Sequence, residues 1–189
     1  MFVQKTDKKV AIFLADGTEM IEALTPVDLL FRAGIPVSTV AVSDKPLIRS
    51  SHDTLIVTDM TVDEVHFDDY DMLVLPGGMP GTTHLMENET LGREIQNYVQ
   101  IGRWVAAICA APMVLGHLGV LEGKQATIYP GMEMHLIGAT PIHEQKVVKD
   151  GRIITSKGPG TAMDFALALV EELKGKSAAD ELRGDLVFG

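Results

Sequence analysis

The sequence predicts an α/β protein in which a mostly parallel sheet is covered by helices on both faces. Short β-rich runs alternate with helical stretches along the 189 residues, and such alternation is typical of strands joined by right-handed crossovers. The first run, VAIFLA at 10–15, is apolar at every position, as expected for a strand that is buried on both faces. The length suits a single domain over 1–189, because single cores commonly reach this size.

Runs of strand length and composition define the expected sheet. The segment 146–156 is predicted to be a hairpin, because its Asp150-Gly151 pair is a strong signal for a two-residue turn. The other expected strands lie at 10–15, 37–42, 54–60, 72–75, 104–108 and 126–129.

Helices are expected between these strands. The first carries Val27, Leu30 and Phe31 at helical spacing and ends at Gly34, a residue type that commonly follows a helix. Gly92 weakens the prediction in the middle of the second helix. The expected helices lie at 22–33, 85–99, 112–118 and 161–176.

Composition limits the classes of partner. The formal net charge is −10, with 16 basic and 26 acidic residues and no basic cluster, which argues against nucleic-acid binding. No stretch approaches the roughly 18 apolar residues of a membrane span, so no membrane is expected. The N-terminus lacks the apolar run of a signal peptide, and the single cysteine excludes an intramolecular disulfide. A cytoplasmic protein is therefore expected.

Parallel sheets bind ligands at the carboxyl ends of their strands. This rule selects four places in the sequence as candidate site loops, namely 16–22, 76–81, 109–112 and the region after Tyr129.

Cys109 lies where an expected strand stops and a helix begins. Pro112 suits the first turn of that helix, and two small alanines leave the sulfur unobstructed. The positive end of a helix dipole favours a thiolate. The alternative is that Cys109 is a small buried hydrophobe, which is the commoner fate of a lone cysteine.

The segment LPGGMPG places Gly77 and Gly78 directly after a buried strand. The N–H of Gly78, paired with that of Ala110, is suited to form an oxyanion hole or to hold an oxidised sulfur. The alternative is a plain glycine-rich turn. The lysine and hydroxyl of a phosphate-binding loop are missing.

Two carboxylates lie at the start of the first helix. The acidic residue at Glu19 has a simple explanation, because acidic side chains at the start of a helix complement the helix dipole. Glu22 lies one turn further along and is expected to point across the carboxyl edge of the sheet. A protonated carboxyl stabilises a neighbouring thiolate and an ionised one opposes it, so this pairing requires a raised pKa for Glu22.

These motifs resemble the ThiJ/PfpI superfamily, and within it the branch of the Parkinson-disease protein deglycase and its bacterial ThiJ-like relatives. The resemblance runs from about residue 9 to 176 and rests on ADGTEMIEALTPVDLLFRAG, DMLVLPGG, AAICAAP and ITSKGPGTAMDFALALVEELKGK. It implies a flavodoxin-like three-layer sandwich that is class I glutamine amidotransferase-like, commonly a homodimer, and a chemistry that needs no cofactor. It assigns the oxidation-prone cysteine to Cys109, its protonated partner to Glu22, and the backbone donors to Gly78 and Ala110.

Two positions depart from relatives of this superfamily. Ala110 stands where the peptidase-like branch carries a histidine, so the general base of a peptidase is missing. Tyr129 stands where many deglycase-like members carry a histidine, and a tyrosine with an ordinary pKa of about 10 is a poor base at neutral pH. His84 is a possible neighbour of the site, as are Arg32 and the loop around His52. Scattered histidines and one cysteine do not predict a metal site.

Three classes of function remain open. The first is a cofactor-independent glyoxalase or deglycase, in which Cys109 forms a hemithioacetal with a reactive aldehyde such as methylglyoxal, or acts on glycated groups, and Glu22 shuttles protons. The second is an oxidative-stress sensor or redox-regulated chaperone that works through oxidation of Cys109. The third is a structural homodimer with an inert cysteine. Some relatives are labelled as peptidases or as thiazole monophosphate (thiamine) biosynthesis proteins, and these functions fit the sequence less well.

Overall fold

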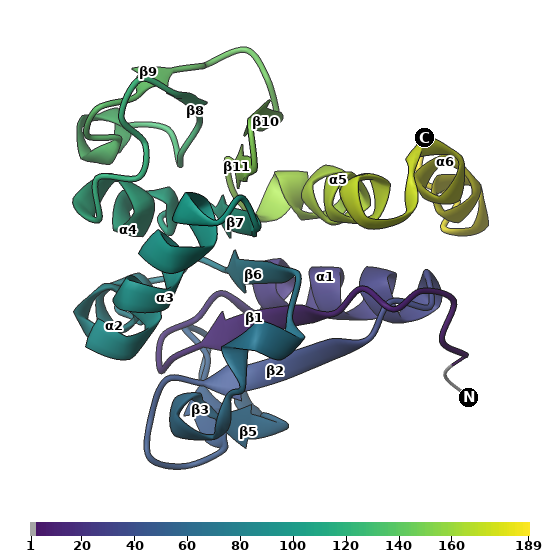
Figure 1. The fold of residues 1–189 in the computed structure, drawn as a ribbon, viewed down its shortest axis with the longest axis horizontal. Coiled ribbons are helices and arrows are strands. Elements are labelled where there is room, and N and C mark those ends of the chain that lie inside the picture. The colour runs from purple at the N-terminus through teal and green to yellow at the C-terminus, as the bar shows by residue number, and fades with distance from the viewer. Residues whose placement is uncertain (1–2) are drawn as a thin grey trace.

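A seven-stranded sheet forms the centre of the protein, whose computed structural model describes residues 3–189 (Figure 1). Every neighbouring pair of strands in it is parallel except β10 and β11. The predicted mostly parallel α/β sandwich is therefore confirmed. In spatial order the strands are β10 (Val147–Asp150), β11 (Ile153–Ser156), β7 (Trp104–Ile108), β6 (Met72–Leu75), β1 (Val10–Leu14), β2 (Val37–Ala41) and β5 (Met60–Thr61).

Helices cover both faces of this sheet, and they bury its central strands on both sides. Along β1, Ile12 and Leu14 pack into the core formed with α1 (Met20–Arg32) and α5 (Ala162–Lys174). Ala11 and Phe13 face the opposite core, which α2 (Gly81–Glu87), α3 (Glu89–Gln100) and α4 (Pro112–His117) complete. The last helix, α6 (Lys176–Asp185), packs on α5 and was not predicted from the sequence.

One predicted helix is two helices. The segment expected as a single helix over 85–99 breaks at Asn88, whose side chain accepts a hydrogen bond of 2.8 Å from the backbone N–H of Leu91. Asparagine is a strong N-cap because its side-chain oxygen satisfies a free N–H of the first turn. This cap starts α3 and separates it from α2.

Two predicted strands are only partly present. Within 54–60, β4 (Leu55–Val57) pairs with β3 (Leu47–Arg49) in a separate hairpin, and only Met60 continues into the central sheet as part of β5. The prediction of a strand over 126–129 was wrong beyond Ala126. The strand observed there, β8 (Gln125–Ala126), pairs with β9 (Thr140–Pro141) and ends at Ala126. The next backbone groups bond elsewhere, because the Thr127 N–H donates to the Thr155 hydroxyl. The remaining short elements are the 3₁₀ turns η1 (Val62–Glu64), η2 (Phe67–Asp69), η3 (Glu133–His135) and η4 (Pro159–Thr161).

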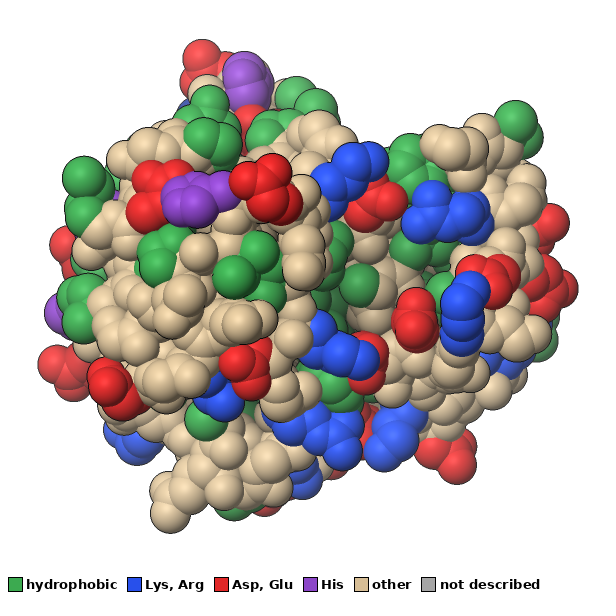
Figure 2. All heavy atoms as spheres, turned by 90° about the horizontal axis from the view of Figure 1, so that it is seen from above, with side chains coloured by type: hydrophobic (Ala, Val, Ile, Leu, Met, Phe, Trp, Pro, Cys, Tyr) green, Lys and Arg blue, Asp and Glu red, His purple; other side chains and the backbone are tan. Residues whose placement is uncertain are grey.

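The surface is mixed in charge. Acidic and basic side chains lie beside one another across the face drawn in Figure 2, and many form ion pairs, such as Lys146 with Asp164 and Lys149 with Glu172. Across residues 3–189, no helix has the length and apolar character needed to span a bilayer.

Candidate active site

Cys109 occupies the turn between β7 and α4, as the sequence predicts. Its φ is +64°, a conformation that is uncommon for a residue with a side chain. The turn is fixed from both sides, because the Cys109 N–H donates to the Ser156 carbonyl at 3.0 Å and its carbonyl accepts from the Tyr129 N–H at 2.9 Å. The thiol is partly buried. Backbone strain held in place by neighbouring strands is a frequent feature of functional sites.

Glu22 lies in the first turn of α1 and is completely buried, with an exposed fraction of 0%. Its Oε2 accepts a hydrogen bond of 2.9 Å from the Gly77 N–H. Its Oε1 is buried and has no nitrogen or oxygen partner among the described residues. A buried carboxyl oxygen that is left unpaired is costly, and it is available to hold a proton or to bind a substrate group.

The environment of Glu22 favours the protonated form. Burial raises its pKa to about 7, while the Cys109 side chain and the Gly77 N–H act in the opposite direction. The negative charge of Glu19 adds a smaller upward contribution. A carboxyl that titrates near neutral pH can both give and take a proton.

The pKa of Cys109 moves in the direction opposite to the one expected from the helix terminus. Burial raises the pKa of the thiol to about 12, and the charge of the Glu22 carboxylate contributes to the rise. The backbone N–H groups of Ala110 and Gly78 bind the sulfur and lower its pKa, but they do not outweigh the other two causes. Two adjacent buried groups cannot both be anionic at low cost. A thiolate at Cys109 therefore requires that the shared proton lie on Glu22.

The glycine loop after β6 brings its backbone against this pair. A Cβ at Gly77 would lie 2.7 Å from the Cys109 Cβ and 2.7 Å from Glu22 Oε2, so no side chain fits there. Gly78 has a φ of +93°, which favours glycine. The loop is tied to the start of α1 by a 2.9 Å hydrogen bond from the Glu19 N–H to the Gly77 carbonyl. The structure thus brings together Cys109, Glu22, Gly77, Gly78 and Ala110.

Tyr129 and a residue that the sequence analysis missed, Gly158, border the same site. Tyr129 is 47% exposed, and its ring lies 3.4 Å from the position that a Cβ of Gly158 would occupy. Gly158 follows β11 at the start of η4. The sequence signal for Gly158 was the GPG that follows the hairpin. This segment comes after the end of another strand, at the carboxyl edge of the sheet.

Glu19 lies near Glu22, on which its charge acts, but both Glu19 and His84 are engaged by other groups. Glu19 caps α1 by accepting the Ile21 N–H at 3.2 Å, and its Oε2 lies 3.2 Å from Nδ1 of His52. His84 Nδ1 lies 2.9 Å from the Asp16 carbonyl.

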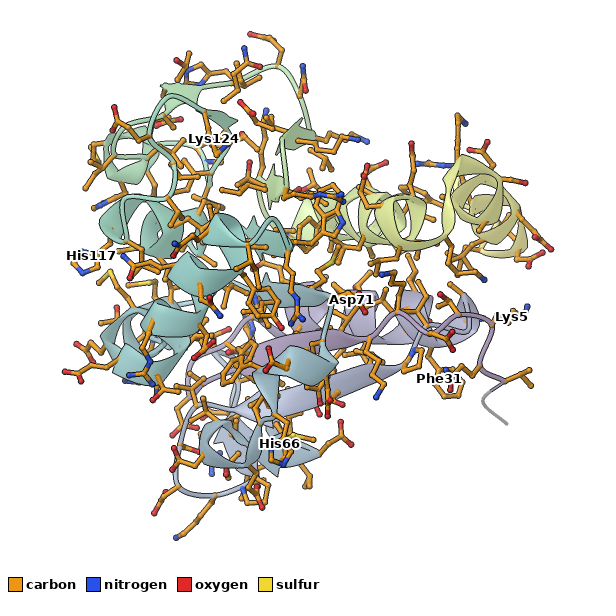
Figure 3. All side chains as sticks on the ribbon, in the orientation of Figure 1. Lys5, Phe31, His66, Asp71, His117 and Lys124 are labelled. Carbon is orange, nitrogen blue, oxygen red and sulfur yellow. The ribbon has the colours of Figure 1, made fainter. Side chains whose placement is uncertain are left out.

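Arg32 is not brought to the site within this chain. It is the last residue of α1 and pairs with Asp28 at 2.7 Å, roughly 15 Å along the helix from Glu22 at the usual rise. Figure 3 labels the preceding residue, Phe31, at the same end of α1 near Lys5.

The remaining histidines do not gather around the thiol. In Figure 3, His117 extends outward from α4, and His66 lies near the edge of the sheet that β5 forms. His143 pairs with Glu133 at 3.6 Å. Among residues 3–189, no three His, Cys, Asp or Glu side chains are grouped so that they could hold a metal ion.

The fold and the site define a class: three-layer α/β proteins with a cysteine on a strained strand–helix turn and a buried, protonatable glutamate beside it. The chain belongs to the DJ-1/PfpI family, whose model matches residues 8–172. It is 39% identical to Protein dj-1beta of Drosophila melanogaster over 181 residues, covering 95% of this chain and 97% of that protein. The crystal structure of that Drosophila protein superposes with a TM-score of 0.93 and covers 97% of this chain and 100% of that one.

Two further relatives bear on chemistry. The glutathione-independent glyoxalase DJR-1.2 of Caenorhabditis elegans is 33% identical over 167 residues, which are 88% of this chain and 89% of that protein. The structure described as Toxoplasma gondii DJ-1, oxidized, is 33% identical, has a TM-score of 0.92, and covers 96% of this chain and 99% of that one.

Proposed function

We propose that the protein is a cofactor-independent glyoxalase or deglycase that acts on reactive aldehydes such as methylglyoxal, or on the groups that they glycate. The observation that carries this proposal is the buried Glu22, one oxygen of which is held by Gly77 while the other is free beside Cys109. A carboxyl with a pKa of about 7 is suited to move protons in both directions at neutral pH. The glyoxalase name of the C. elegans relative supports the same chemistry.

The proposed reaction begins with addition of the thiol to the aldehyde. Glu22, in its ionised form, takes the thiol proton while the Cys109 sulfur bonds to the aldehyde carbon. The electron pair of the carbonyl becomes an alkoxide, which receives that proton from Glu22 and forms the hemithioacetal. The N–H groups of Gly78 and Ala110, which lie against the sulfur, are placed to stabilise the developing negative charge.

Proton transfer then converts the adduct into product. Glu22 takes the hydrogen from the former aldehyde carbon as a proton, and the electron pair of that C–H bond forms a double bond to the neighbouring ketone carbon, while the ketone oxygen keeps the carbonyl electron pair and gains a proton, which gives an enediol. The hydroxyl on the sulfur-bearing carbon then loses its proton and its electron pair forms the thioester C=O bond, while the electron pair of the C=C bond takes the proton from Glu22 onto the former ketone carbon. The result is a lactate thioester on Cys109. Water cleaves it to lactate and regenerates the thiol. The aldehyde carbon is oxidised while the ketone carbon is reduced, so no external oxidant or reductant is needed. The reaction requires a free thiol, so a reducing compartment such as the cytoplasm is part of the proposal.

Lactate formation from methylglyoxal tests this proposal. We expect the wild type to produce lactate, and Cys109→Ser and Glu22→Gln each to lower kcat/KM by about a thousandfold, because both groups act in the bond-making steps. Glu19→Gln is the matched control, since it lies on the same helix and keeps an oxygen to cap it; we expect less than a threefold change. A wild type that makes no lactate contradicts the proposal.

A second candidate is a redox sensor in which Cys109 is oxidised to a sulfinic acid held by Glu22. The backbone donors at Gly78 and Ala110 suit oxygens on the sulfur, and the Toxoplasma relative is described as oxidized. Mass spectrometry after mild peroxide is expected to detect a two-oxygen adduct on Cys109 in the wild type and less of it in Glu22→Gln. An unmodified Cys109 would remove this candidate.

We also propose that two copies of the chain associate. Apolar side chains are exposed at the start of α1 and on β4, including Ile21 at 50%, Leu24 at 41%, Leu55 at 55% and Val57 at 76%. Contiguous exposed apolar residues commonly mark an interface. Light scattering is expected to give twice the 20.4 kDa mass of the chain, and Val57→Glu to shift it to the monomer. A wild type that is monomeric at micromolar concentration contradicts this.

A further inference from the structure

A cleft of about 310 Å³ lies at the amino ends of the central strands, away from the catalytic pair. Trp104, in its lining, begins β7, and Cys109 follows the last residue of that strand, so roughly 16 Å of strand separates the two at the usual rise. Asp71, which Figure 3 labels, precedes β6 at the same edge of the sheet. The volume is that of a small-molecule site. Five of the residues that line the cleft are charged, namely Lys8, Asp71, Arg103, Arg152 and Glu172.

Lysines neutralise the two carboxylates of this cleft. Asp71 accepts a hydrogen bond of 2.8 Å from the Lys8 ammonium and another of 3.0 Å from the backbone N–H of the next residue, Lys9. The Glu172 carboxylate lies 2.5 Å from the ammonium of Lys149. Once these pairs are formed, the two arginines are the unbalanced charges of the cleft.

Arg103 is held in place by the protein itself. Its Nη1 donates to the carbonyls of Tyr70 at 3.2 Å and Phe67 at 3.4 Å, and its guanidinium lies over the Tyr98 ring, 5.4 Å from the ring centre. The same Nη1 lies 3.7 Å from Asp68, whose side chain is 97% exposed, and an ion pair this exposed contributes little. No carboxylate or carbonyl among residues 3–189 bonds the other two nitrogens of the group. The guanidinium is therefore oriented and still has free donors.

Arg152 is held by a ring alone. Its guanidinium carbon lies 4.6 Å from the centre of the Trp104 ring. Within the part of the chain that the structure describes, its side chain forms no ion pair and donates no hydrogen bond. A guanidinium carries five N–H donors in a rigid planar group, and contact with a ring face leaves them for an anion. The cleft thus presents two arginines, each positioned by an aromatic ring and each with donors to spare.

We propose that this cleft binds a phosphate group, as the free ion or as the phosphate monoester of a small molecule. Arginine binds phosphate through paired, charge-assisted hydrogen bonds. The charges agree, because Arg103 and Arg152 balance a group that carries about −1.5 to −2 at pH 7. A nucleic acid is a poor occupant, since the chain as a whole has a net charge of −10 and repels a polyanion. This site is independent of the reaction proposed at Cys109.

The fluorescence of Trp104 reports occupation of the cleft, because this is the single tryptophan of the chain and it lies under Arg152. We expect titration with inorganic phosphate or glycerol 3-phosphate, at an ionic strength held constant with sodium chloride, to give a saturable change in the millimolar range. The ligand with the lower dissociation constant identifies the source as the free ion or the monoester. A change that does not saturate with either ligand, or an equal response to acetate or glycerol, overturns the proposal.

Substitutions of Arg152, followed by isothermal titration calorimetry, test the role of the arginine without relying on the Trp104 signal. Arg152→Gln is expected to raise the dissociation constant at least tenfold, because it removes charge-assisted hydrogen bonds. Arg152→Lys is expected to raise it at least threefold, since an ammonium keeps the charge but lacks the planar fork. Arg183→Gln is the matched control. It removes the same charge from an arginine that lies over the Phe188 ring, 4.9 Å from its centre and outside the cleft, so a change below twofold is expected. Equal effects of Arg152→Gln and Arg183→Gln would overturn the site.

Cys109→Ser separates this cleft from the catalytic site. We expect it to bind both phosphate ligands within twofold of the wild type, because Trp104 and Cys109 lie at opposite ends of β7. Loss of binding in Cys109→Ser would place the phosphate at the catalytic site and overturn the proposal. Thermal unfolding establishes that the variants are folded, and Arg152 is exposed, so its replacement leaves the core intact. A wild type that binds phosphate as expected but makes no lactate supports the cleft and overturns the reaction proposed at Cys109.

Discussion

The two sides of the site are built in different ways. On one side, Glu22, Gly77 and Cys109 follow the buried strands β1, β6 and β7, and their backbones are hydrogen-bonded to neighbouring loops and strands. On the other side, Tyr129 and Gly158 come from an irregular segment after β8 and from the turn after β11. The first is called the rigid side here because it is built on buried strands, and the second the irregular side. The two meet at Cys109, whose N–H and carbonyl are bonded to Ser156 and Tyr129.

Apart from substitution of Cys109 and Glu22 themselves, the largest effect is expected on the rigid side, from Gly77→Ala. Its Cβ would lie 2.7 Å from the Cys109 Cβ and 3.0 Å from the Ala110 nitrogen, and both of these atoms are held by β7. Displacement of the reacting groups by about 1 Å commonly costs 100-fold in rate, so we expect at least that loss of kcat/KM with methylglyoxal. Overpacking is also expected to lower the free energy of unfolding by roughly 1–3 kcal/mol, measured by urea denaturation.

Gly160→Ala serves as the control for Gly77→Ala, because its Cβ meets open space. A Gly77→Ala variant with wild-type activity would show that the glycine loop can move away from Cys109. The rigid side would then be no more constrained than the irregular one.

A smaller effect on the same side is a dependence of stability on pH. Burial raises the pKa of Glu22 from 4.5 to about 7, so the folded state binds this proton more tightly than the unfolded state does. The resulting stabilisation is complete below pH 4.5 and is lost as the pH rises through about 7, and it amounts to about 3 kcal/mol. In Glu22→Gln the side chain cannot titrate, so the variant lacks this pH-dependent contribution to stability.

The measurement is the free energy of unfolding of wild type and Glu22→Gln at several pH values. We expect the wild type to lose stability relative to the variant between pH 4.5 and 8, and Glu19→Gln to follow the wild type. Parallel curves for wild type and Glu22→Gln would show that the Glu22 pKa is not raised.

On the irregular side, Thr155→Val is expected to have a moderate effect. The Thr155 hydroxyl accepts a 2.9 Å hydrogen bond from the Thr127 N–H, and both residues are buried. Valine keeps the shape but leaves that N–H unpaired, which costs roughly 1–3 kcal/mol. The segment that carries Tyr129 is loosened, so kcat/KM for methylglyoxal is expected to fall severalfold.

The exposed Thr54→Val is the matched control for Thr155→Val, and its unfolding free energy is expected to stay within about 0.5 kcal/mol of the wild type. The rate of Cys109 alkylation by iodoacetamide is expected to stay within twofold in Thr155→Val, because the Cys109 N–H keeps its bond to the Ser156 carbonyl and the glycine loop is unchanged. A large change in that rate would mean that the two sides are coupled.

The same contrast explains what could be predicted from the sequence. The apolar runs of β1, β6 and β7 are buried on both faces, so their pattern specifies them locally, and the rule for the carboxyl ends of parallel strands then selects the loops of Glu22, Gly77 and Cys109. The direction of the Cys109 pKa was not predictable in this way. It depends on burial and on the Glu22 charge, and both of these arise only from tertiary packing.

The irregular side escaped prediction for the same reason. The segment after Ala126 has the composition of a strand, but its backbone groups bond to the Thr155 side chain and to the Cys109 carbonyl instead of to a neighbouring strand. Such partners are distant in sequence and leave no local pattern. Gly158 was missed because its importance lies in what stands opposite it, the Tyr129 ring and Glu22 Oε1.

The smallest effect is expected from Tyr129→Phe. Phenylalanine keeps the ring that faces Gly158 and removes only the phenol oxygen of a side chain that is 47% exposed. Because Glu22 moves the protons in the proposed reaction and a phenol is a poor base at neutral pH, kcat/KM for methylglyoxal is expected to change by less than threefold. Tyr129→Ala, which removes the ring as well, is the comparison. A loss of about 100-fold in Tyr129→Phe would instead make the phenol a proton donor to the substrate, and the irregular side would then take part in the chemistry.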